Sequence, residues 1–171
     1  MKRSAALFFA VIFLISTLFS CSAVRTDRAS CREVVAAMVE SEIGVPAGKY
    51  YSLSAPEGDG EYLSNSLLSA LFGNGSLPTV PRDWLDCALF LSLKESPCEF
   101  AVILCSSRDA AKDTAALLHS RLSAIKVTKA LPEYSQMIEN ASVTITGNYA
   151  IFIISTDPVS ALRAAKKAIR K

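Results

Sequence analysis

The sequence is poor in the residues on which most sites of known chemistry depend. Its 171 residues include one histidine and five cysteines, and no two cysteines stand in a Cys-x-x-Cys pair. These absences exclude the usual zinc ligand sets. No glycine-rich phosphate loop joins a strand to a helix, and no serine stands in a Gly-x-Ser-x-Gly elbow. We therefore expect neither a metal nor a cofactor.

The chain also lacks an excess of charge of one sign. Its formal net charge is +2 and its pI is about 8.3, too balanced for a protein that binds mainly through phosphate contacts, so nucleic acid is excluded as a partner. Seven glycines, seven prolines and a hydrophobic content of 51% exclude collagen-like, coiled-coil and disordered chains. Five cysteines are too few here for a disulfide scaffold. The length fits one domain with a short appendage.

The first residues have the pattern of a secretory signal peptide. Lys2 and Arg3 precede an apolar run, Ala5 to Phe19, that only Ser16 and Thr17 interrupt. The run is shorter than the roughly 20 residues of a membrane-spanning helix. We predict that residues 1–20 are a signal peptide.

The end of this run resembles the lipobox of bacterial lipoproteins, in which a cysteine thiol takes a diacylglyceryl group and becomes the first mature residue. Leu18, Ser20 and Cys21 fit that pattern, whereas Phe19 departs from it. We predict that Cys21 carries the lipid, with fatty acids such as palmitate, and anchors the protein outside the cytoplasm to the bacterial cell membrane. Ordinary secretion with cleavage after Ala23 and a retained N-terminal anchor are the alternatives.

The remaining chain is expected to consist of a tether, residues 21–29, and a single domain, residues 30–171. Its charges balance but are segregated: residues 33–61 hold six acids and one base. The C-terminal segment holds five bases and no acid, namely Arg163, Lys166, Lys167, Arg170 and Lys171. These bases either complement the C-terminus of a helix or attract anionic lipid or wall polymer beside the anchor.

Capping and helix-breaking residues divide the domain into helices. Ser30 and Glu33 form a capping box. Residues 44–60, rich in glycine and proline, are expected to form a loop in which Tyr50 and Tyr51 can form a short edge segment. The expected helices are 31–43, 61–72 capped by Asp59, 108–126 capped by Ser107, 133–140, and a last one that begins at Pro158 after its cap Asp157.

Two β-hairpins complete the fold. The first joins strands 87–94 and 99–105, and the second joins strands 142–146 and 149–154 through Gly147-Asn148. A four-residue first turn predicts that Leu93 faces Phe100, Leu91 faces Val102 and Leu89 faces Leu104. Both faces are apolar, so we expect helices on both sides. The predicted fold class is α+β: two β-hairpins forming a four-stranded antiparallel sheet packed with about five helices.

Several stretches resemble the DUF4358 family, a group of uncharacterised lipoproteins from Firmicutes. They are Ser96-Pro97-Cys98-Glu99-Phe100-Ala101-Val102, the helix ending at Arg121, the helix of Tyr134, and Asn140-Ala141-Ser142-Val143 leading to Gly147-Asn148-Tyr149-Ala150-Ile151. The resemblance implies an exported lipoprotein with an α+β fold. It implies nothing about mechanism, because the family has no assigned activity.

Candidate catalytic residues are few. His119, the only histidine, lies beside the apolar stripe of its helix, and we interpret it as a half-buried structural residue rather than the base of a cysteine nucleophile. Four cysteines remain after Cys21, and both a disulfide and buried free thiols stay open. The predicted register places two of them on opposite faces of the hairpin, which argues against that pair. The four are Cys31, Cys87, Cys98 and Cys105.

Two further groups suggest binding. Glu57, Asp59 and Glu61 form either a solvated acidic loop or a weak cation site. Four aromatic residues near this loop can line a ligand groove, namely Tyr50, Tyr51, Tyr62 and Trp84. With no catalytic set, the favoured function is a non-enzymatic binding or interaction module for an unknown envelope ligand or protein. The alternative is an envelope enzyme, hydrolase-like, whose residues are scattered along the chain.

Overall fold

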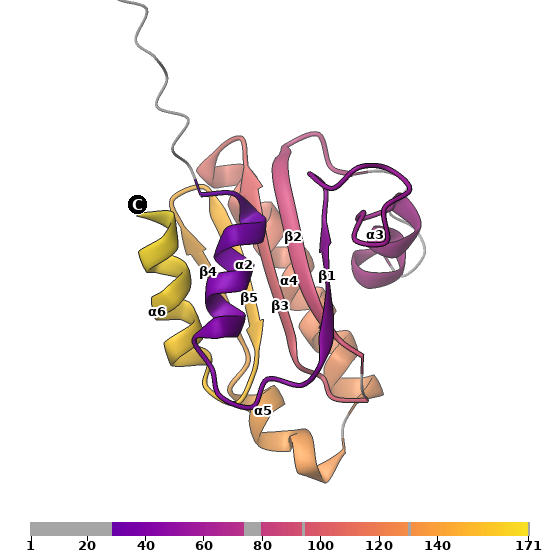
Figure 1. The fold of residues 1–171 in the computed structure, drawn as a ribbon, viewed down its shortest axis with the longest axis vertical. Helices are drawn as coiled ribbons and strands as arrows, with labels where there is room; N and C mark the ends of the chain where they lie inside the picture. The colour runs from indigo at the N-terminus through magenta and orange to yellow at the C-terminus, as the bar shows by residue number, and fades with distance from the viewer. Residues whose placement is uncertain (1–28, 74–79, 94, 130, 171) are drawn as a thin grey trace, which may run out of the picture.

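A five-stranded antiparallel sheet lies between two layers of helices (Figure 1). The computed structural model describes residues 29–73, 80–93, 95–129 and 131–170. The strand order is β1-β2-β3-β5-β4. The helical segments are α2 Cys31–Glu40, α3 Asn65–Phe72, α4 Arg108–Thr128, the 3-10 turn η1 Pro132–Tyr134, α5 Ser135–Glu139 and α6 Pro158–Ile169. The strands are β1 Gly48–Ser52, β2 Trp84–Ser92, β3 Glu99–Cys105, β4 Ser142–Thr146 and β5 Tyr149–Ile154.

The predicted α+β class is confirmed, but the predicted number of four strands is wrong. The additional strand is β1, at the edge of the sheet, which pairs with β2 inside the segment expected to be a loop. It includes Tyr50 and Tyr51, where the sequence allowed a short edge segment. The Tyr50 ring packs edge-on against Phe90 across the pair, with ring centroids 5.1 Å apart. Gly48 lies so close to Phe90 that a Cβ there would stand 2.1 Å from the ring. Glycine in this segment therefore allows close strand pairing instead of breaking the strand.

The first predicted hairpin exists, but its register is wrong by three positions. Leu91 pairs with Glu99, and Val102 pairs with Ala88, so Leu91 and Val102 lie on opposite faces. The amide of Ser92 donates to the carbonyl of Cys98 at 3.2 Å, which makes the connection longer than the assumed four-residue turn. Because side chains alternate along a strand, a shift by an odd number of residues places the predicted partners on opposite faces of the sheet.

The same correction applies to two of the cysteines. Cys87 pairs with Ile103, and a bulge in β2 lies beside the pairing of Trp84 with Cys105. Cys87 and Cys105 therefore lie in the same hydrophobic cluster, not on opposite faces. All four described cysteines are nevertheless free thiols.

The second hairpin forms as predicted. Its strands are β4 and β5, and Gly147 in the turn has a φ of 59°, a left-handed conformation that suits a two-residue hairpin turn. Val143 pairs with Phe152, and Ile145 pairs with Ala150, on one face of the sheet. The short turn fixes the register, which explains why the sequence was sufficient here.

The helix caps agree with the sequence except at α3. The Ser30 hydroxyl accepts a hydrogen bond from the amide of Glu33 at 3.2 Å, and the Glu33 carboxylate accepts a hydrogen bond from the amide of Ser30 at 2.8 Å. The cap of α3 is Ser64, not Asp59. Asp59 instead accepts from the amide of Glu61, a local turn that competes with helix formation. The helix expected over 133–140 is divided into η1 and α5.

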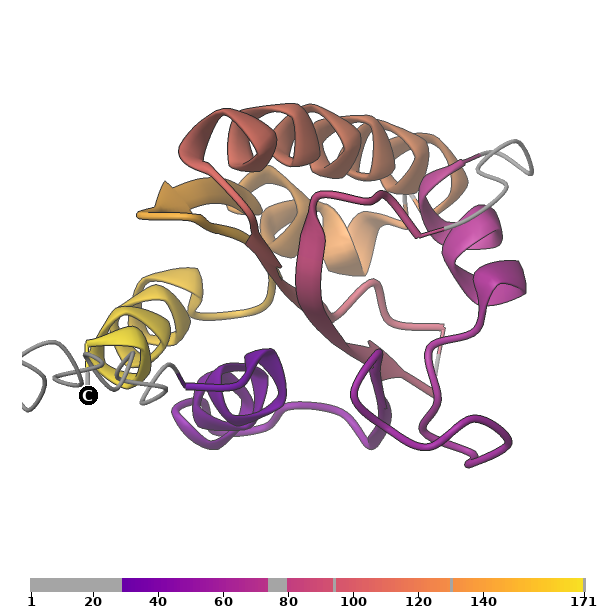
Figure 2. The same cartoon turned by 90° about the horizontal axis from the view of Figure 1, so that it is seen from above.

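Both faces of the sheet are covered, as predicted (Figure 2). One hydrophobic cluster lies between the sheet and α3, α4 and α5, and the other lies between the sheet and α2 and α6. Both clusters consist of residues from Ala29 onward.

Candidate functional site

Helix α6 is positioned by its small residues, which leaves its opposite side open. Asp157 caps the helix by accepting from the amide of Ser160 at 3.1 Å, and Pro158 is its first residue. Ala161 and Ala165 are fully buried in the cluster that α6 shares with α2. Because alanine brings the helix close to its neighbours, the long side chains of α6 project outward.

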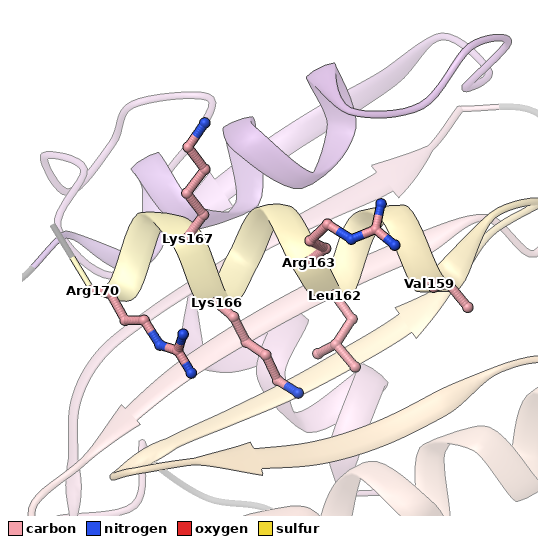
Figure 3. A pocket seen from close by; sticks show the side chains of 6 residues that line it. All are labelled: Val159, Leu162, Arg163, Lys166, Lys167 and Arg170. Atoms are coloured by element: carbon pink, nitrogen blue, oxygen red, sulfur yellow. The ribbon is translucent and has the colours of Figure 1, made fainter.

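A groove of about 540 Å³ runs along this outer side (Figure 3). It is lined by Val159, Leu162, Arg163, Lys166, Lys167 and Arg170, a set called here the α6 surface. Figure 3 shows the four cationic side chains spreading from successive turns of α6 in different directions. Such a surface suits an extended anionic partner better than one small anion, which would need converging donors.

The cations of the α6 surface form no ion pair within the part of the chain that the structure describes. Among the residues that the structure describes, the ion pairs are Arg32–Glu61, Lys112–Asp109 and Arg121–Glu99, and none of them includes α6. The pKa of Asp157 lies below its ordinary value, chiefly because of the Ser160 hydrogen bonds, with Arg163 a smaller cause. The charge of the α6 surface is therefore available to a partner.

Stabilisation of the helix C-terminus explains only part of this cluster. Lys166 and Lys167 lie in the last turn of α6, and Arg170 is its C-terminal cap, where positive charge stabilises a helix. Arg163 lies in the middle of the helix, beyond the range of that effect. Lys171, the fifth base of the predicted cluster, lies outside the described residues.

The α6 surface lies close to the place where the described chain begins. The Glu42 carboxylate accepts from the amide of Asp157 at 3.2 Å, so the residues after α2 meet the beginning of α6. Helices α2 and α6 are therefore antiparallel, and the start of α2 lies near the C-terminal end of α6 (Figures 1 and 2). The Tyr149 hydroxyl donates to the Ala29 carbonyl at 3.3 Å and fixes this entry point.

A second cavity, of about 240 Å³, brings together two segments that the sequence singled out. It is lined by Glu42, Gly44, Val45, Pro46, Ser96, Cys98, Tyr134, Met137 and Thr156. Cys98 is only 3% exposed, and burial, followed by the nearby carboxylates of Glu42 and Glu99, raises its pKa to about 12. The thiol is thus protonated at neutral pH and unsuited to nucleophilic attack.

The other three described thiols are also unreactive in this fold. Burial is the largest cause that raises the pKa of Cys31, Cys87 and Cys105, and nearby acids or thiols add to it. His119 is exposed on α4, not half-buried as expected, because its position on the helix turns away from the sheet. No hydrogen bond joins it to any described cysteine, so the structure forms no Cys–His pair in this part of the chain.

The two predicted binding groups are not assembled into sites. Glu57, Asp59 and Glu61 are exposed, and Glu61 pairs with Arg32 at 3.5 Å. The expected aromatic groove is wrong, because Tyr50 and Tyr51 pack into different clusters on opposite faces of the sheet. In the described ranges, no group of three or more histidine, cysteine or acidic residues is placed to hold a metal ion.

A buried ion pair between the sheet and α4 was not predicted from the sequence. Glu99, at the start of β3, accepts two hydrogen bonds from the guanidinium of Arg121 on α4. The sequence did contain a signal for this contact, because Glu99 begins a strand that was expected to be covered on both faces, where a carboxylate needs a partner. The pair engages both carboxylate oxygens of Glu99 and leaves it no free role as a catalytic acid or base.

Comparison of the chain with models of protein families, with curated proteins and with solved structures gave no match in any of the three. The resemblance to the DUF4358 family stays a hypothesis. No helix in the described part of the chain is long and apolar enough to span a membrane. The predicted signal peptide, residues 1–20, and the predicted lipidation site, Cys21, lie outside the described residues, as does most of the predicted tether.

Proposed function

We propose that this chain is an exported lipoprotein, anchored by a lipid on Cys21 outside the cytoplasm, whose domain binds an envelope ligand or protein without catalysis. The resemblance of Leu18 to Cys21 to a lipobox supports the anchor, and the resemblance to the DUF4358 family supports the class. The observation that carries the binding role is the α6 surface, where four described cations have no acidic partner.

The described residues favour binding over catalysis. His119 is exposed and has no thiol or carboxylate partner, while all four described thiols are buried and held in their protonated form. Glu99 is neutralised by Arg121. The hydrolase-like alternative needs a nucleophile beside a base, and these contacts do not supply one within the described ranges.

The anchor is tested with Cys21→Ala in the full chain, expressed in a bacterium that processes lipoproteins. Ser22→Ala, a change at the next residue that keeps the thiol, is the matched control. We expect Cys21→Ala to abolish acyl-lipid labelling and to accumulate unprocessed precursor, while the control is processed normally. Unchanged mass and unchanged membrane retention in Cys21→Ala would refute the lipoprotein assignment.

A further inference from the structure

We infer that the α6 surface docks on anionic lipid headgroups of the membrane to which the chain is anchored. The domain then lies against that membrane with α6 between the headgroups and the rest of the domain. The inference rests on the proposed lipid anchor and names the partner of the binding surface. Its support comes from the charge, the shape and the position of α6, which are independent of one another.

The charge of the α6 surface fits a plane of phosphates. Arg163, Lys167 and Arg170 are exposed and Lys166 is half-buried, and none forms an ion pair among the described residues. Their side chains spread along the helix rather than converge (Figure 3). Several headgroup phosphates side by side can contact all four of these cations, whereas a single phosphate can contact only one or two of them.

Apolar side chains lie among these cations, as in helices that bind a membrane interface. Val159 is 65% exposed, and Leu162, which packs partly against the core, lines the same groove. Interfacial helices place apolar side chains at the boundary between headgroups and acyl chains while their lysines and arginines contact the headgroups. The α6 surface combines both features on a helix of 12 residues.

The position of α6 makes the membrane the nearest anionic partner. The chain from Cys21 to Ala29 spans at most about 29 Å when fully extended, and α6 is about 18 Å long. The start of α2, two residues after Ala29, lies near the C-terminal end of α6 (Figure 1), and the cations of the α6 surface lie from the middle of that helix to its C-terminal end. The acids Glu42 and Asp157 lie at the opposite end of the helix. A lipid on Cys21 therefore holds the cationic end of α6 within reach of the surface, at a high effective concentration.

The test uses residues 22–171 without the lipid, so that only the domain's own affinity is measured. Both hydrophobic clusters consist of residues from Ala29 onward, so this chain keeps the described core. Co-sedimentation is measured with vesicles of phosphatidylglycerol and phosphatidylcholine, with vesicles of phosphatidylcholine alone, and over a series of salt concentrations. Soluble polyglycerol phosphate is the probe for an anionic wall polymer.

One variant removes the charge of the α6 surface, namely Arg163→Gln, Lys166→Gln, Lys167→Gln and Arg170→Gln. The matched control removes as many exposed charges elsewhere, namely Arg82→Gln, Arg108→Gln, Lys112→Gln and Lys126→Gln. Circular dichroism and urea unfolding verify that both variants fold. Because one cation near an anionic surface raises partitioning about fivefold, we expect the α6 variant, which lacks four cations, to bind on the order of 600-fold more weakly.

The expected result is salt-sensitive binding to phosphatidylglycerol vesicles that the control largely retains and the α6 variant loses. Equal loss in both variants would show that net charge alone matters and would overturn the inference. Absent vesicle binding, or binding to polyglycerol phosphate alone, would also overturn it, the latter in favour of a wall polymer. None of these outcomes affects the proposal of a lipid anchor. That proposal is refuted only if the Cys21→Ala protein stays fully processed and membrane-retained.

Discussion

Glu99 and Arg121 form a paired hydrogen-bonded contact between the sheet and α4. Arg121 Nε donates to Glu99 Oε1 at 3.2 Å, and Arg121 Nη2 donates to Oε2 at 2.8 Å. The Glu99 side chain is only 5% exposed and that of Arg121 is 17% exposed. A carboxylate in this position is stable because the guanidinium replaces the hydrogen bonds that water would supply. The pair thus joins the start of β3 to the helix that covers it.

Removing one member of this pair is predicted to cost far more than an exposed ion pair would. Arg121→Ala leaves the Glu99 carboxylate buried without a partner, and we expect the free energy of unfolding to fall by about 3–5 kcal/mol. Urea unfolding measures the change. Lys112→Ala, which breaks the exposed pair with Asp109 on the same helix, is the control and is expected to cost less than about 1 kcal/mol. Similar losses in both variants would show that the Glu99 carboxylate does not depend on Arg121.

The close approach of β1 to β2 yields a second prediction. In Gly48→Ala the new Cβ would stand 2.1 Å from the Phe90 ring and 2.7 Å from the carbonyl oxygen of Leu91. The backbone oxygen cannot move aside alone, so we expect a destabilisation of about 1–3 kcal/mol, typical of overpacking. Gly60→Ala is the control, because its Cβ would meet only the end of the flexible Lys49 side chain, at 3.3 Å. Equal melting temperatures for the two variants would contradict the described pairing of β1.

The two hairpins show which parts of the sheet the sequence could determine. The turn at Gly147 leaves one register for β4 and β5, and the sequence predicted their bounds correctly. In the first hairpin both faces are apolar, so a register that pairs Leu91 with Val102 satisfies the pattern as well as the true one. The choice depends on the path of the connection before Glu99, which apolar alternation does not encode.

Contacts between distant residues account for what the sequence could not show. Strand β1 is stabilised by the packing of Tyr50 on Phe90, which lies far along the chain. The bases of α6 were visible as a charge cluster, but their lack of an ion pair among the described residues and their nearness to the start of α2 depend on the fold, in which α2 and α6 pack antiparallel. The candidate surface could thus be located from the sequence, whereas its availability and orientation required the fold.

The capping box at the start of α2 yields a third prediction. Ser30→Ala removes the side-chain acceptor for the amide of Glu33, and we expect it to cost about 1 kcal/mol in urea unfolding. The pKa of Glu33 lies below its ordinary value because it accepts from the amide and then from the hydroxyl of Ser30. Ser30→Ala removes the hydroxyl but keeps the amide, so the pKa of Glu33 should move only part of the way upward toward 4.5, as measured by an NMR titration.

The control for the capping box is Ser135→Ala, since the Ser135 hydroxyl donates to the carbonyl of Pro132 and contacts no carboxylate. The pKa of Glu33 should stay unchanged in this variant. An unchanged pKa of Glu33 in Ser30→Ala would instead show that the box does not persist in solution.

The buried thiol of Cys98 predicts how stability changes in alkali. Its pKa is raised from the ordinary 9.0 to about 12, so the folded state keeps a proton that the unfolded chain releases. The resulting stabilisation is complete below pH 9 and is lost as the pH rises through 12, with a slope of up to about 1.4 kcal/mol per pH unit. Cys98→Ala removes this contribution, so the difference in unfolding free energy between the two chains should shrink across that window. Parallel curves from pH 8 to the alkaline limit of folding would show that the thiol of Cys98 is not held in its protonated form by the fold.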